Sequence, residues 1–574
     1  MIDMRSIFSH IRLFTALMLF GVMLLSCQKE GPHRAQGLLE QEREDVVNAW
    51  LSLNLNIVSS GAATKAAPEV NGGTNNGIDE NAITRLAIWL VPAEGGTEDW
   101  SEAIMTYVPQ VSLGSGDEYV SSVRTKLNVP MNVYVGANIS TDIASAFLAG
   151  GPDAVYEAAT AAYPDDYQSL VEEFASADRG VAMFCVKKAS LTFKSDNANK
   201  LTPAIIDEDS NGTPESVDLV RMLAKVHLLF QCYDEHPEFV QITEPGSLTP
   251  AAFGAFGWSK LDDISYIVNT VNKSTKIIQP AYGNTDYTIY EDLNHSMTDL
   301  LQKGLEWEYK SGAGDHFLGF AEDLSGDHDA AWAKWSAKPE KYEENKAPFG
   351  TCTDGTYVNG LYCLENTTDD SALSSMTDDE KKYVPFMVAT HIIVKARFVP
   401  RYIISGTDIG GAPVTESFDA SACSDAFDFL AEKTAAQGTK DENGNPIDYP
   451  KGTFFTRDMK EFYSYDGMMA VIASKGYPRK SFAAYPGGYG FYYSYINGGK
   501  SPSTGQIEFR APKAEDTEND YNSGVYRNHY HILNCSLMKV PATPGSFNQL
   551  MMVNSKVVDW NPKGALNLIV KPNV

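Results

Sequence analysis

The sequence is poor in cysteine, in basic residues and in long apolar runs. Its 574 residues include 7 cysteines, and these form neither a CxxC pair nor the spacing of zinc ligands. Cys352 and Cys363 flank a turn-like stretch and could bridge a hairpin in an oxidising compartment, with buried free thiols as the alternative. The 46 basic residues against 74 acidic ones give a net charge of −28. Phosphate binding needs a basic surface, so this charge argues against nucleic-acid partners and suits an exported protein that resists aggregation.

Motifs for catalysis are also lacking, since neither GxSxG nor HExxH occurs. The best metal candidate is the stretch 207–218. Asp207, Asp209 and Asn211, followed by a glycine, match the beginning of a calcium loop, and Asp218 stands where a bidentate glutamate normally lies. A proline and an expected strand after it argue against an EF-hand. An ordinary acidic turn is therefore the alternative, and no metal is assigned.

The N-terminus carries a short export signal. Two arginines precede an apolar run over residues 13–25, which is too short to cross a membrane as a helix. The run ends in Leu-Leu-Ser-Cys, which is typical of a bacterial lipobox, and polar residues follow at once. We predict that residues 1–26 are a signal peptide and that Cys27 is acylated, which would hold the protein on the outer membrane. A plain signal peptide with an incidental cysteine is the alternative.

Most of the chain has the pattern of a mainly β protein. Helical character is expected over 141–163, interrupted by Gly150, Gly151 and Pro152, while the aromatic-rich segment 463–495 indicates faces of sheets. Segments rich in β-branched residues predict strands over 85–93, 127–140, 220–233 and 391–405. These patterns favour β-sandwiches.

One apolar stripe stands apart near the N-terminus. Leu51, Leu53, Leu55 and Ile57 alternate with polar residues, which predicts a strand with one buried face. A glycine-rich stretch of small residues follows and is of the kind that proteases cut readily; Lys65 lies within it. A strand that belongs in a core is thus joined to the rest by a cleavable tether.

Several segments in this order resemble the fimbrial subunits of Bacteroides-type bacteria, the type V pilins, and among them the major subunits (fimbrilins) of short fimbriae. They include DENAITRLAIWLVPAEGG, VYVGANIS, LVRMLAKVHLLF, HIIVKARFVP, GGYGFYYSYI, VYRNHYHILNCSL and KVVDW. The resemblance implies two transthyretin-like β-sandwich domains with a few short helices, a lipoprotein precursor, proteolytic maturation, no enzymatic activity and no cofactor. Relatives are usually cut after an arginine by a trypsin-like protease, whereas this sequence offers Lys65 followed by Ala66.

The resemblance also implies how the chain is divided. We expect a propeptide with a removable strand over 27–65, an N-terminal domain over 66–280 and a C-terminal domain over 281–574. The last segment, 562–574, carries an apolar stripe of its own, with Leu566, Leu568 and Val570 alternating with other residues. It is a candidate donor strand for another subunit, or else the last edge strand of its own domain.

The expected function is a structural subunit of cell-surface fimbriae that polymerises by strand exchange and supports adhesion. Its partners would be other copies of itself, accessory fimbrial subunits, the maturation protease and ligands on host or bacterial surfaces. The precursor would be lipid-anchored in the outer membrane and the mature form would lie in the fimbrium. A fimbrial anchor or tip component is one alternative, and a surface glycan-binding lipoprotein or hydrolase is another.

Overall fold

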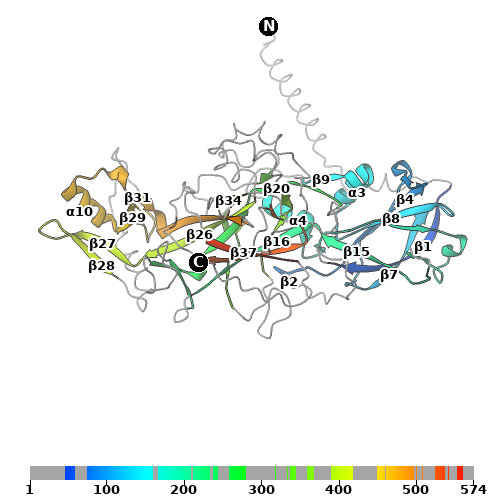
Figure 1. The fold of residues 1–574 in the computed structure, drawn as a ribbon, viewed down its shortest axis with the longest axis horizontal. Coiled ribbons are helices and arrows are strands. Elements are labelled where there is room, and N and C mark those ends of the chain that lie inside the picture. Colours follow the sequence, from blue (N-terminus) through cyan, green and yellow to red (C-terminus); the bar gives the residue numbers. More distant parts are fainter. Residues whose placement is uncertain are drawn as a thin grey trace, which may run out of the picture.

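The computed structural model describes residues 45–58, 74–158, 166–207, 211–232, 237–242, 257–278, 317–318, 332–333, 336–343, 359–367, 390–417, 449–458, 460–496, 499–500, 507–508, 524–525, 527–536, 541 and 552–559. These residues form an elongated molecule that is built mostly from strands (Figure 1). Within this part of the chain, no helix has the length and apolarity needed to cross a membrane. The predicted mainly β, sandwich-type fold with a few short helices is confirmed.

One end of the molecule is a curled sheet in which the described residues form ten strands. These are β1 (Val47–Ile57), β4 (Leu86–Glu94), β5 (Thr97–Glu98), β6 (Ile104–Val108), β7 (Glu118–Thr125), β8 (Pro130–Ala137), β12 (Met183–Cys185), β13 (Ala189–Thr192), β14 (Ala204–Ile205) and β15 (Ser216–Arg221). The main path runs β14–β1–β15–β12–β8–β4–β5, with β7 on β1, β6 on β4 and β13 on β8.

The middle of the molecule holds two sheets of five strands each among the described residues. The first combines β16 (Leu223–Phe230), β23 (Glu340–Lys341), β24 (Leu361–Leu364), β36 (His529–Ser536) and β37 (Met552–Asp559). The second combines β17 (Phe239–Ile242), β18 (Gly257–Lys260), β19 (Ser265–Asn269), β26 (His391–Pro400) and β32 (Tyr489–Tyr495).

The other end carries the sheet of β27 (Tyr402–Thr407), β28 (Pro413–Ser417), β29 (Phe454–Arg457), β30 (Glu461–Tyr463) and β31 (Ala483–Tyr485), beside helix α10 (Tyr465–Lys475) (Figure 1). Shorter two-stranded pairs complete the described strands. They are β2 (Thr74–Asn75) with β3 (Ile78–Asp79), β9 (Val155–Glu157) with β21 (Ser274–Lys276), β10 (Ala175–Ser176) with β11 (Gly180–Val181), β20 (Val271–Asn272) with β22 (Phe317–Leu318), β25 (Asn366–Thr367) with β35 (Gly524–Val525), and β33 (Gly499–Lys500) with β34 (Ile507–Glu508).

The pairing of β16 bears on where the two halves of the chain divide. β16 pairs with β23, β24 and β36, which all come from beyond residue 281, and β19 likewise pairs with β26. The predicted strand over 220–233 is therefore two strands of different sheets, β15 and β16, with Met222 between them. We propose that the N-terminal domain ends at Met222 rather than at residue 280. β21, which follows Met222 in the sequence, pairs with β9 and so connects the segment after Met222 to the N-terminal domain.

Of the expected helical segment 141–163, residues 141–150 form a helix, and residues 159–163 lie outside the described part of the chain. α3 (Thr141–Gly150) begins at Ser140, whose hydroxyl accepts from the N–H of Ile143 at 3.2 Å, and it ends where Gly151 takes φ +61°. A 3₁₀ helix (Gly151–Asp153) and β9 follow, because Tyr156 is buried in a strand pair with β21. A second α-helix in this part of the chain, α4, spans Asp166–Phe174.

The aromatic-rich segment 463–495 is only partly sheet, contrary to the prediction. α10 lies within it, capped by the hydroxyl of Ser464, which accepts from the N–H of Gly467 at 3.1 Å. Gly476 ends the helix in the left-handed conformation at φ +70°. Local capping signals therefore outweigh the alternating aromatics here, while β31 and β32 carry the sheet character that was expected.

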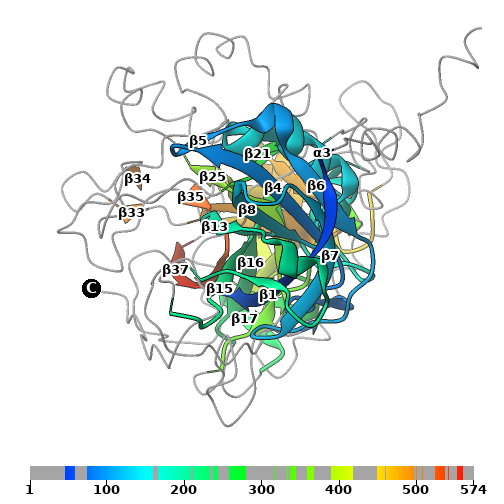
Figure 2. The same cartoon turned by 90° about the vertical axis from the view of Figure 1, so that its right-hand side faces the viewer.

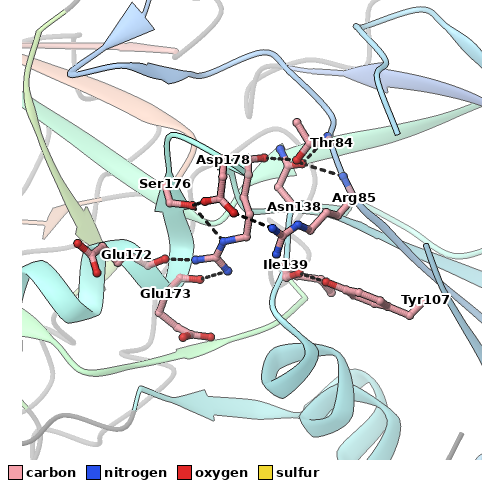
Figure 3. A network of polar contacts seen from close by, with 10 residues as sticks. Thr84, Arg85, Tyr107, Asn138, Ile139, Glu172, Glu173, Ser176 and Asp178 are labelled. Carbon is pink, nitrogen blue, oxygen red and sulfur yellow. Dashed lines mark hydrogen bonds and ion pairs between the residues drawn. The ribbon is translucent and has the colours of Figure 1, made fainter. Parts of the chain in front are cut away.

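A polar network fixes the beginning of β4 against the end of β8 (Figure 3). Asn138 takes φ +56°, a left-handed conformation that asparagine tolerates better than most residues. Its side-chain oxygen accepts from the N–H of Thr84 at 2.8 Å, and its amide donates to the carbonyl of Ala82 at 2.7 Å. Beside it, Arg85 pairs with Asp178 at 2.7 Å. These contacts join the beginning of β4 to the end of β8 within the sheet that contains β1.

Candidate strand-exchange site

Strand β1 lies inside its sheet and has neighbours on both edges. On one edge it pairs with β7 in antiparallel fashion, from Val47 opposite Thr125 to Asn54 opposite Glu118. On the other edge it runs parallel to β14 and then to β15, where Ile57 lies opposite Leu219. Figure 2 shows β1 at the end of the molecule that faces the viewer, beside β7 and β15. Removing β1 would therefore open two strand edges at once.

The inner face of β1 is part of the core. Leu51, Leu53, Leu55 and Ile57 are all fully buried, and so is Ala49. Burying the four larger side chains contributes roughly 6–12 kcal/mol before ordering costs, at about 1.5–3 kcal/mol for each. The segment that the sequence singled out is thus a core strand, and its loss would leave an apolar groove.

The outer face of β1 meets acidic side chains of its two neighbours. The hydroxyl of Ser52 donates to Oε1 of Glu118 in β7 at 2.5 Å. Asn56 donates from Nδ2 to Oδ1 of Asp218 in β15 at 3.0 Å. Asn54 lies between these two positions, and its Oδ1 is buried without a hydrogen-bond partner. On this face, the side chains at positions 52 and 56 each donate to a carboxylate of a neighbouring strand, and position 54 between them carries an unsatisfied amide oxygen.

The end of β1 is held by a residue from the far end of the sequence. The carbonyl of Val58 accepts from Nδ2 of Asn528 at 2.8 Å, and the N–H of Val58 donates to the carbonyl of Leu219 at 2.9 Å. The side-chain oxygen of Asn528 in turn accepts from the N–H of Arg221 at 3.2 Å. The contact to Val58 uses only its backbone, so any strand that fills the groove could make it.

A buried charged cluster lies next to this contact. Glu80 and Lys225 are fully buried and pair at 2.7 Å, and the hydroxyl of Tyr362 donates to Glu80 at 2.6 Å. Arg221 donates from Nε to the carbonyl of Glu80 at 3.1 Å and from Nη2 to Asn81 at 2.7 Å. Burial lowers the pKa of Lys225, and it lowers the pKa of Arg221 to about 10. The cluster joins the chain that follows the tether to β15 and β16.

Both ends of the tether are therefore anchored. Val58 is the last described residue before it, and Thr74 is the first after it. Asn75 is fully buried and donates to the carbonyl of Gly360 at 3.0 Å. A cut between these ends would leave β1 attached through noncovalent contacts alone.

The predicted calcium residues have protein partners. Asp207 accepts from the backbone N–H groups of Asn211 at 2.9 Å and Gly212 at 2.7 Å, as in a turn. Asp218 lies in β15 against Asn56. Asp209 lies outside the described residues. Among those residues, His, Cys, Asp and Glu side chains form no group of three that could hold a metal ion.

The other predicted functional residues lie outside the described part of the chain. They are Cys27, Lys65, Ala66, Leu566, Leu568 and Val570. Of the cysteines, Cys185, Cys232, Cys363 and Cys535 are buried free thiols, and Cys352 is not described.

The sequence did not indicate the partners of β1. Glu118, Asp218 and Asn528 come from three distant segments, and only Asp218 was singled out, for a different role. The buried pair Glu80–Lys225 was also missed. A short polar alternation does not reveal which distant side chains it faces.

Comparison with known proteins finds no matching family model and no matching curated protein. The chain is similar to solved structures from Bacteroidales. A "putative cell adhesion protein" from Parabacteroides distasonis is 13% identical, with 90% of this chain and 98% of that chain covered and a TM-score of 0.38. A fimbrilin from Porphyromonas gingivalis is 13% identical, with 90% and 99% covered and a TM-score of 0.33. A tip fimbrial protein from the same organism, truncated at its C-terminus, is 12% identical, with 90% and 100% covered and a TM-score of 0.32.

Proposed function

We propose that this protein is a structural subunit of cell-surface fimbriae. It is exported as a lipoprotein acylated at Cys27, cut between Lys65 and Ala66 by a trypsin-like protease, and polymerised by strand exchange. In this proposal the lipid holds the precursor in the outer membrane, and the mature subunit leaves it for the fimbrium. There it contacts other copies and accessory subunits and supports adhesion to host or bacterial surfaces. No nucleic acid, cofactor or catalysis is involved.

One observation carries the proposal: β1 is an interior strand with a fully buried apolar face, and its covalent link to the rest contains a candidate cleavage site. An interior strand normally needs no cleavable connection. If it leaves, the edges of β7 and β15 have unpaired backbone groups, and an incoming strand can satisfy them. A contact of this kind between one copy and the next does not close into a ring, so it produces an open filament.

The test compares Lys65→Ala with Lys480→Ala, an exposed lysine far from β1 along the chain. We expect Lys65→Ala to accumulate as a full-length precursor that carries a palmitate label and forms no fimbriae. Lys480→Ala should be processed and assembled like the wild type. Electron microscopy, N-terminal sequencing and labelling with a palmitate analogue measure the three properties.

The N-terminus of the polymerised protein decides between roles. Fimbriae that begin near Ala66 would support a shaft subunit. Fimbriae that contain the chain from Cys27 onward, still lipidated, would overturn maturation by cleavage and favour an anchor. Normal fimbriae from Lys65→Ala would show that the cut lies elsewhere.

A further inference from the structure

The polar face of the groove carries information that the apolar face does not. Every alternate position on the apolar face accepts an aliphatic side chain, so this face allows an incoming strand to slide by two residues at a time. A slide by one residue would turn its apolar side chains outward. The outer face is different, because the side chain at position 52 donates to the carboxylate of Glu118, which is the pairing partner of position 54, and the side chain at position 56 donates to Asp218. Between them, position 54 holds an asparagine whose oxygen has no hydrogen-bond partner.

This inference rests on the proposed function and takes the C-terminal segment 562–574 of a second copy as the incoming strand. We propose that Glu118 and Asp218 set its register, with Leu566 at the position of Leu51. Asn567 then lies where Ser52 lies and can donate to Glu118. Lys571 lies where Asn56 lies and pairs with Asp218. Ile569 takes the position of Asn54, which an apolar side chain suits better than an unsatisfied amide oxygen.

The neighbouring registers fit worse. With Leu566 at position 53, Ala565 takes the place of Ser52 and Ile569 takes the place of Asn56, so Asp218 loses its donor. With Leu566 at position 49, Lys571 lies at position 54 opposite Glu118, and Asn573 takes the place of Asn56. Pro572 then takes the position of Leu55, whose N–H donates to the carbonyl of Asp117 at 3.1 Å, so this backbone hydrogen bond is lost. Among these three registers, the proposed one gives each carboxylate a donor, leaves position 54 apolar and keeps the backbone hydrogen bond from position 55 to Asp117.

The proline of the tail is also tolerated in this register. Pro572 takes the position of Ile57, whose backbone N–H donates to the hydroxyl of Ser115 at 3.1 Å. A proline there loses one bond to a side chain, which can rotate to another partner. Asn573 then takes the place of Val58, and its carbonyl can accept from Asn528.

The first experiment reads the register directly. Purified wild-type fimbriae are treated with a carbodiimide, which joins amines to adjacent carboxylates, and the cross-linked peptides are identified by mass spectrometry. The proposal expects a bond between Lys571 of one copy and Asp218 of another. A bond from Lys571 to Glu118 in its place would overturn it.

The second experiment changes charge in the full-length chain. Lys571→Glu places like charges opposite each other and should reduce the yield of fimbriae about tenfold. Asp218→Lys combined with Lys571→Glu should restore it. The matched control is Lys563→Glu in the same tail, which lies at the position of Asn48, opposite Arg124, and should assemble normally. Equal yields for Lys571→Glu and Lys563→Glu would overturn the proposal.

Deletion of residues 562–574 separates this register from strand exchange itself. If the deletion abolishes fimbriae while Lys571→Glu does not affect them, exchange stands and the register falls. If the chain without residues 562–574 still forms fimbriae, the tail is not the donor strand, and both the exchange of this tail and its proposed register are wrong.

Discussion

Individual charged residues inside the molecule are stabilised only as members of a group. The side chains of Glu80 and Lys225 are fully buried and form an ion pair, and the hydroxyl of Tyr362 donates a further hydrogen bond to Glu80. Desolvation of two charges costs several kcal/mol, which their attraction offsets only while both are present. The pair therefore adds little net stability. Its main effect is to favour the arrangement in which Glu80, after the tether, lies beside Lys225 of β16.

A double-mutant cycle tests this reasoning. Lys225→Met leaves a buried carboxylate without its cation and should lower the free energy of unfolding by about 3–5 kcal/mol. Combining it with Glu80→Gln should recover part of that loss, because the buried carboxylate that Lys225 neutralised is no longer charged. Urea denaturation of the four proteins measures the cycle. Strictly additive losses would contradict the coupling.

A second prediction concerns Glu98, which accepts from Lys188 at 2.7 Å, Tyr134 at 2.7 Å and Asn132 at 2.6 Å. Burial alone would raise its pKa, but these hydrogen bonds outweigh burial and lower it. A carboxyl with a lowered pKa in the folded state contributes stability above its unfolded pKa. That contribution disappears as the pH falls through the folded pKa.

The variant Glu98→Gln should therefore lose less stability than the wild type between about pH 6 and pH 3. Denaturation midpoints measured across this range provide the comparison. Glu94→Gln, an exposed change in the same hairpin, serves as the control and should follow the wild type. Identical slopes for Glu98→Gln and the wild type would refute the assignment.

At the scale of elements, β1 combines two properties that rarely occur together. It is paired on both edges, as a central strand is, and it lies near the chain terminus beyond a potential cleavage site. Its retention after a cut depends on side-chain burial, on backbone pairing and on the side-chain hydrogen bonds of Ser52 and Asn56. The same contacts that stabilise the precursor therefore control how quickly the groove opens.

Shortening one buried side chain of β1 should expose this dependence. Leu53→Ala should lower the free energy of unfolding of the precursor by about 2–5 kcal/mol, since it removes buried contacts and leaves a cavity. Leu201→Ala, at a leucine that is 87% exposed, should change it by less than about 0.5 kcal/mol. Chemical denaturation measures both. A small effect at Leu53 would mean that β1 is not held by its apolar face.

At the scale of the whole molecule, β1 lies at one end of an elongated series of sheets (Figure 1). Asn528, just before β36, holds the end of β1, while β36 pairs along its full length with β37. The candidate donor segment follows β37 in the sequence. Subunits that exchange strands would thus be joined through the sheet that already connects the two halves of each copy.

Deleting residues 562–574 should leave a soluble monomer that resists proteases and melts normally, but forms no filaments. The reason is that a donor strand contributes to its neighbour's core and not to its own. Differential scanning calorimetry and electron microscopy measure the two properties. A deletion that fails to fold would instead identify this segment as the last strand of its own domain.

The sequence by itself determined the local features of this protein. The alternation of Leu51, Leu53, Leu55 and Ile57 predicts a strand with one buried face, and the structure has a strand there. The strands β4 and β8 also follow from local patterns, and so does helix α3, which is the first part of the helical segment predicted over 141–163. Such features depend on residues within a few positions of one another, so composition and periodicity are sufficient.

Only the tertiary structure decided what these elements contact. Ser52 meets Glu118 across 66 residues, Asn56 meets Asp218 across 162, and Val58 meets Asn528 across 470. The bend at Met222 and the burial of Glu80 beside Lys225 likewise depend on sheets that form from distant strands. Contacts of this kind have no local signal, because many distant segments offer equivalent edges and carboxylates. The folded chain selects among them by the burial and hydrogen bonding of all the strands together.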